Sequence, residues 1–130
     1  MPAQFFKRNK YNAAKTVYNG VKYDSKFEAA VAARLDHDVQ AGVILAYDRQ
    51  VPVKITAFDA HGKEHLLCTH RVDFRMHNAD GSFTLLEAKG FQTAEWKRKY
   101  KWLKLFWLPN HADHDYQLIT EETFYSLNRS

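Results

Sequence analysis

The chain has 130 residues, 15% of them aromatic, and a net charge of +4, which predicts a single globular domain large enough to bury its own core. No apolar stretch approaches the length of a membrane span, and the charged N-terminus lacks the apolar segment of a signal peptide, so we expect a cytoplasmic protein. A lone cysteine, Cys68, excludes an internal disulfide and a thiolate zinc site.

Residues 1–20 are predicted to be a basic N-terminal arm that precedes one domain over residues 21–130. The arm mixes basic residues with Asn and aromatic residues and has no sustained periodicity. Basic side chains in such an arm bind phosphates, and the candidates for DNA contact are Lys7, Arg8, Lys10 and Lys15. The alternative is a segment that packs on its own domain through Phe5 and Phe6.

A first helix is predicted from Ser25 to Gln40, because apolar residues recur at every fourth position and Ala41-Gly42 provides a stop. Ser25 and Glu28 have the spacing of a capping box, in which the glutamate hydrogen-bonds back to the amide of the cap residue. Glu28 also lies beside the apolar stripe, where its carboxylate could reach a metal. The residues leave both interpretations open.

Three consecutive antiparallel strands are expected next. Residues 43–47 and 49–58 supply the first, a turn at residues 60–63 leads into residues 65–77, and a hairpin leads into residues 82–89. The hairpin segment Asn78-Ala79-Asp80-Gly81 is typical of a type I turn followed by a glycine in the left-handed region. We therefore predict a loop of three residues.

A loop of that length determines which residues face each other. Counting outward places Asp73 opposite Glu87 and Arg71 opposite Lys89, with all four charged groups on one face. The other face then carries apolar residues suited to a core: Val72, Phe74, Met76, Leu86 and Ala88. A loop of two residues would slip the register and place the two carboxylates on opposite faces.

Two opposed carboxylates repel each other unless a cation lies between them. Mg²⁺ is typically bound by one or two carboxylates with water and substrate phosphate oxygens, so it would fit. Lys89 could orient or help deprotonate an attacking water, or neutralise charge on phosphorus, and His70 lies close enough for a substrate contact. The alternative is a solvated face on which Arg71, Arg75 and Lys89 form weak ion pairs, each worth about 0–1 kcal/mol.

A second helix is predicted over residues 93–108, a fourth strand over 115–120 and a terminal helix over 121–128. A strand reached through a crossover helix usually runs parallel to the one before it. We therefore expect an α/β (α+β) fold with a mixed sheet of about four strands and helices on its faces.

The helical wheel of residues 93–108 has one apolar side, formed by Trp96, Tyr100, Leu103, Phe106 and Trp107. Trp102 and Leu105 lie off this side, and Lys99 lies within it. The surplus apolar surface predicts a dimer interface.

The positive charge is concentrated in two segments. Residues 1–26 carry six Lys and Arg against one Asp, and residues 93–108 carry five against one Glu. In the second segment a basic stripe lies beside the apolar side, formed by Lys97, Lys101 and Lys104. Basic segments around an acidic centre suit a polyanion, although charge runs are also typical of solvated faces.

The combined pattern resembles the PD-(D/E)xK nuclease superfamily, and more closely its phage endonuclease I-like family, relatives of small Holliday junction resolvases. The resemblance spans nearly the whole chain, and its motifs lie at residues 10–13, 23–28, 49–52, 72–74 and 87–90. One departure is Val72, which occupies the position of the superfamily's proline before the aspartate.

The resemblance implies a restriction-endonuclease-like core in which Asp73 and Glu87 bind Mg²⁺ or Mn²⁺. It also implies a further carboxylate from Glu28 and a lysine, Lys89, that positions the nucleophile. Gln50 is a candidate for orienting water or contacting the DNA backbone, and Arg71 for contacting DNA. The implied activity is that of a metal-dependent endonuclease acting on branched DNA in phage DNA metabolism, as a homodimer in the host bacterial cytoplasm.

Other functions are left open by the sequence. They are a nuclease of the same fold acting on unbranched or single-stranded DNA, a non-catalytic nucleic-acid-binding module, and a structural phage protein.

Overall fold

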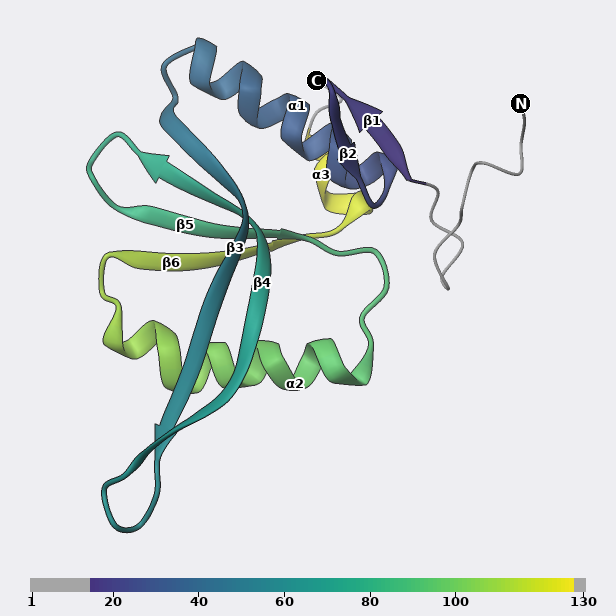
Figure 1. Ribbon diagram of the computed structural model, residues 1–130. Coiled ribbons are helices and arrows are strands. Elements are labelled where there is room, and N and C mark those ends of the chain that lie inside the picture. The colour runs from purple at the N-terminus through teal and green to yellow at the C-terminus, as the bar shows by residue number, and fades with distance from the viewer. Residues whose placement is uncertain (1–14, 128–130) are drawn as a thin grey trace.

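The structure, a computed structural model, describes residues 15–127 (Figure 1). A short hairpin, β1 (Thr16–Tyr18) and β2 (Val21–Tyr23), precedes helix α1 (Lys26–Gln40). The elements that follow are β3 (Ile44–Phe58), β4 (Glu64–Asn78), β5 (Phe83–Ala88), α2 (Ala94–Trp102), β6 (His114–Ile119) and α3 (Glu121–Leu127). Among the described residues, none of the helices has the length and apolar character needed to cross a membrane.

The main sheet has the strand order β3-β4-β5-β6. Its first three strands are antiparallel neighbours, whereas β6 runs parallel to β5 after the crossover through α2. α1 and α2 lie on opposite sides of this sheet (Figure 1). The fold is therefore the expected mixed α+β arrangement, with the order α-β-β-β-α-β-α from α1 onward, and it is consistent with a restriction-endonuclease-like core.

The β4–β5 hairpin confirms the predicted loop. The Asn78 N–H donates to the Ser82 carbonyl at 2.9 Å, the Gly81 N–H donates to the Asn78 carbonyl at 3.0 Å, and Gly81 has φ +91°. A side chain at that φ would be strained, which explains the glycine. Phe74 pairs with Leu86 in the predicted register, and the paired residues end there, directly before Asp73 on β4 and Glu87 on β5.

Two apolar cores lie on the two sides of the sheet. The first packs α1 against the sheet and contains Phe27, Val31, Leu35, Phe74 and Leu86, with Met76 and Ala88 at its margin. The second lies on the α2 side and contains Val53, Ile55, Val72, Leu85 and Leu103. Val72 was expected on the same face as Phe74, and that expectation is wrong, since the two residues belong to different cores.

The long β3–β4 ribbon explains this change of face. Side chains two residues apart normally share a face, so the ribbon must turn over between Phe74 and Val72. On β3 the pairs Arg49↔Phe74 and Val51↔Val72 enclose Gln50, whose φ is +52°. A left-handed residue within a strand reorients the chain locally, and beyond it the ribbon passes α2 and extends away from the sheet (Figure 1).

The apolar side predicted for residues 93–108 is partly wrong. Trp96 and Leu103 are buried as expected, but Phe106 is exposed, whereas Trp102 packs against the second core. Residues Leu103–Trp107 form a π-helical segment, whose wider turn shifts the phase of all later side chains. Lys99, which the wheel left unexplained, forms an ion pair with Glu95 at 3.2 Å.

Residues 16–20, expected to be part of the arm, instead form β1 and the turn into β2. Tyr18 and Val21 of this hairpin pack against the first core beside α1. Of the arm's candidates for DNA contact, Lys7, Arg8 and Lys10 lie outside the described residues.

Candidate metal centre

Three carboxylates from three elements meet near the point where the ribbon turns over. They are Glu28 from α1, Asp73 from β4 and Glu87 from β5. Burial, followed by the negative charges of Glu28 and Glu87, raises the pKa of Asp73 to about 8. Charges that raise the pKa of a neighbouring carboxyl lie near it, so both glutamates lie near Asp73.

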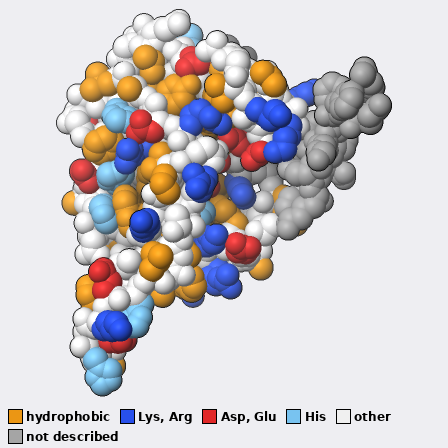
Figure 2. Space-filling model, viewed as in Figure 1, with side chains coloured by type: hydrophobic (Ala, Val, Ile, Leu, Met, Phe, Trp, Pro, Cys, Tyr) orange, Lys and Arg blue, Asp and Glu red, His pale blue; other side chains and the backbone are white. Residues whose placement is uncertain are grey.

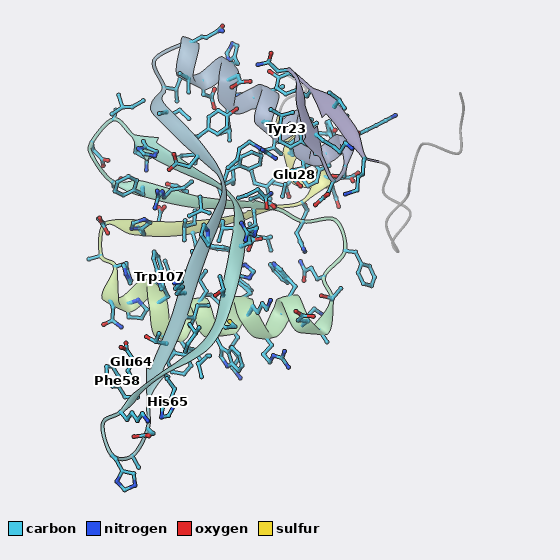
Figure 3. All side chains as sticks on the ribbon, in the orientation of Figure 1. Tyr23, Glu28, Phe58, Glu64, His65 and Trp107 are labelled. Carbon is cyan, nitrogen blue, oxygen red and sulfur yellow. The ribbon has the colours of Figure 1, made fainter. Side chains whose placement is uncertain are left out.

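Glu28 is buried, with 6% of its surface exposed. Its N–H donates to the Ser25 hydroxyl at 3.1 Å, so Ser25 caps the helix as predicted. Its side chain, however, accepts a hydrogen bond from Gln50 Nε2 at 3.3 Å. The carboxylate therefore points toward β3 and the centre, and Figure 3 shows Glu28 where the start of α1 meets the sheet.

The charges around Glu28 act in both directions. Burial and the charge of Asp24 raise the pKa of Glu28, whereas Arg49 and Lys89 lower it. The net effect is a raised pKa for Glu28, and the two cations offset part of the cost of burying its ionised form.

Glu87 is the most enclosed of the three acids, with 2% of its surface exposed. Its Oε1 lies 2.5 Å from His70 Nε2 and accepts hydrogen bonds from the Tyr116 hydroxyl at 2.7 Å and from Trp96 Nε1 at 3.3 Å. Burial and the charge of Glu87 raise the pKa of Tyr116, so the hydroxyl keeps its proton and remains a donor.

Asp73 interrupts the ladder between β4 and β5. Its Oδ2 accepts a hydrogen bond from the backbone N–H of Ala88 at 2.9 Å. A backbone donor that would otherwise pair with a neighbouring strand thus holds a carboxylate instead. The contact fixes Asp73 beside Ala88, the last residue of β5, which lies between Glu87 and Lys89 in the sequence.

Lys89 completes the set of four predicted residues. Its Nζ lies 5.7 Å from the centre of the Trp96 ring, and its backbone N–H donates to the Ile119 carbonyl at 2.9 Å. Its positive charge lowers the pKa of both Asp73 and Glu28. Because Glu87 and Lys89 both contact Trp96, they share a face as predicted.

The donor set suits a hard divalent cation. Within residues 15–127, no group of three or more His, Cys, Asp or Glu side chains is spaced to hold a metal ion by itself. Mg²⁺ and Mn²⁺ need fewer protein ligands, since water and phosphate oxygens complete the shell. A cation between Asp73 and Glu87 would also relieve the repulsion that raises the pKa of Asp73.

The predicted DNA-binding residues lie in different surroundings. Lys15 forms an exposed ion pair with Asp24 at 3.0 Å, and the Arg71 guanidinium donates to the Gln50 carbonyl at 3.4 Å. Exposed lysines lie on α2 and the π-helical segment, namely Lys97, Lys101 and Lys104. Lys and Arg side chains are spread over the face between α1 and α2 in Figure 2.

Sequence reasoning missed several neighbours of the centre. Arg49 lies with its guanidinium carbon 4.3 Å from the centre of the Tyr23 ring, and its Nε is buried without a hydrogen-bond partner among the described residues. Trp96 was expected only in the core, and no role was expected for Tyr116. His70, expected near substrate, is instead buried against Glu87. The sequence shows that His70, Trp96 and Tyr116 carry polar hydrogens, but it does not show that all three contact Glu87.

The comparisons with known proteins give a family and no function. No curated protein and no solved structure matched the chain. One family model matched residues 8–116, a range that includes all four residues of the candidate centre. The chain therefore belongs to the family described as "Protein of unknown function (DUF1064)".

Proposed function

We propose that this protein is a Mg²⁺-dependent DNA endonuclease that hydrolyses phosphodiester bonds in branched DNA. The observation that carries the proposal is that Glu28, Asp73, Glu87 and Lys89 lie together, where burial and the two glutamates raise the pKa of Asp73 and the lysine lowers it. A solvated face would not bury two of these acids almost completely.

Asp73 and Glu87 would hold the cation, and Glu28 would add a further carboxylate. When bound, such a cation lowers the pKa of a coordinated water and stabilises charge on the leaving oxygen. The Lys89 ammonium orients the attacking water through its donors and offsets negative charge on the phosphate. The water would lose one proton as its oxygen bonds to phosphorus, the bond from phosphorus to the 3′ oxygen would break, and the 3′ oxygen would gain one proton, so that one water is consumed.

The positive surface supports DNA as the substrate. Exposed Lys97 and Lys101 follow Trp96 on α2, and Trp96 itself contacts both Glu87 and Lys89. DNA with a phosphate at the centre would therefore lie near α2, whose exposed lysines could bind neighbouring phosphates. The choice of branched over linear or single-stranded DNA, and of a homodimer over a monomer, rests on the resemblance of the sequence motifs.

The test is a cleavage assay with a four-way junction, a linear duplex and a single strand, each in Mg²⁺ or in EDTA. We expect Glu87→Ala and Lys89→Ala to reduce cleavage by at least about 100-fold, because each removes a group acting on the reacting phosphate. Glu122→Ala, which changes an exposed acid on α3, is the matched control and should cut like the wild type.

The outcomes distinguish the candidate functions. Cleavage that persists in EDTA or in both variants contradicts the proposed centre. Binding of all three DNAs without cleavage in Mg²⁺ or Mn²⁺ favours a non-catalytic module. Equal cutting of junction and linear duplex would keep the nuclease and reject the preference for branches.

A further inference from the structure

The Glu87 carboxylate is held by an unusual number of donors for a group proposed to bind metal. His70, Tyr116 and Trp96 all reach the same oxygen, Oε1, at 2.5, 2.7 and 3.3 Å. They come from three different elements, β4, β6 and α2. A carboxylate oxygen has about two lone-pair positions, so these contacts occupy Oε1 fully.

The donors are themselves fixed by packing. His70 has 3% of its surface exposed. The Trp96 ring stacks on Tyr100 with centroids 5.0 Å apart, and Tyr100 lies 5.0 Å from Tyr116. A row of three aromatic rings therefore positions two of the donors, and rotation of Glu87 would break all of these hydrogen bonds at once.

We infer that His70, Tyr116 and Trp96 are positioning residues that hold the Glu87 carboxylate in one orientation, with Oε1 bound by the protein and Oε2 presented to the cation. The inference rests on the proposed function, since it assigns these residues to the same centre. Groups that bond to a metal ligand in this way fix its direction and increase metal affinity.

Tyr116→Phe gives the sharpest test, because it removes one hydroxyl and leaves the ring in place. We expect the Mg²⁺ and Mn²⁺ concentrations for half-maximal cleavage to rise about 10–100-fold, while saturating metal restores most of the maximal rate. Binding of Mn²⁺ without DNA, measured by calorimetry, should weaken by a similar factor. Tyr47→Phe is the matched control, because Tyr47 donates to Asp36 at 2.6 Å outside the centre.

A second pair of variants separates positioning from folding. His70→Gln keeps an N–H donor, whereas His70→Leu keeps the bulk and loses the donor. If His70 positions Glu87, His70→Gln should bind Mn²⁺ more tightly than His70→Leu although their thermal midpoints are similar. Equal Mn²⁺ affinity in the two folded variants would contradict a role for the donor.

The results separate this inference from the proposed function. A wild type that binds no Mn²⁺ and cuts no DNA overturns both. A wild type that cuts with metal, beside a Tyr116→Phe variant with unchanged metal affinity and metal dependence, overturns the positioning role alone.

Discussion

Burial of the Asp73 carboxylate carries an electrostatic cost at the candidate centre. Its pKa is raised to about 8, first by burial and then by the charges of Glu28 and Glu87. An acid whose pKa is higher in the folded state than in the unfolded state binds more protons when folded. Without a cation, folding stability must therefore fall as the pH rises from about 4 to about 8.

Removing this charge should stabilise the metal-free protein. We expect Asp73→Asn to raise the free energy of unfolding in EDTA at pH 8, by at most about 6 kcal/mol for a shift to a pKa of about 8, with little gain near pH 4. Urea unfolding from pH 4 to 9 measures this, with the exposed Asp115→Asn as control. Mg²⁺ should stabilise the wild type only. If the free energy of unfolding of the wild type and of Asp73→Asn changed in parallel with pH, the role of the raised Asp73 pKa in stability would be contradicted.

At the scale of elements, the sequence predicted what local patterns determine. Apolar periodicity located α1, and the glycine of the β4–β5 loop set the hairpin register, which pairs Phe74 with Leu86 next to Asp73 and Glu87. The π-helical segment and the turn-over of the ribbon were missed, because neither has a signal in the local sequence pattern. Gln50 is not a glycine, so nothing in its local sequence marks a left-handed residue.

The ribbon's turn at Gln50 is expected to be a strained feature retained for the centre. Gln50→Gly and Gln50→Ala both remove the amide that donates to Glu28 at 3.3 Å, but only glycine adopts φ +52° without cost. Gln50→Gly should therefore be more stable than Gln50→Ala by about 1 kcal/mol, as measured by urea unfolding. Both should need more Mg²⁺ for cleavage, and equal stability of the pair would argue against strain.

At the scale of the whole molecule, the exposed lysines of α2 lie on a different element from the three carboxylates of the centre. The double variant Lys97→Ala/Lys101→Ala should weaken binding of duplex DNA. A plot of the logarithm of the association constant for duplex DNA against the logarithm of salt concentration has a negative slope. The variant should make this slope shallower by about 0.9 for each phosphate contact that it loses. Fluorescence anisotropy in EDTA measures the affinity, and Lys63→Ala, at the exposed ribbon end, is the control. An unchanged salt slope would exclude α2 from the DNA interface.

The two cores on opposite sides of the sheet give the centre a mechanical consequence. Glu28 extends from the helix of the first core, whereas Glu87 is bonded to Trp96 and Tyr116 on the side of the second. A cation shared by these carboxylates would tie the two halves of the domain together across the sheet. Cation binding would then make the domain more rigid, so the metal-bound form that is proposed to cleave DNA would also be the more rigid form.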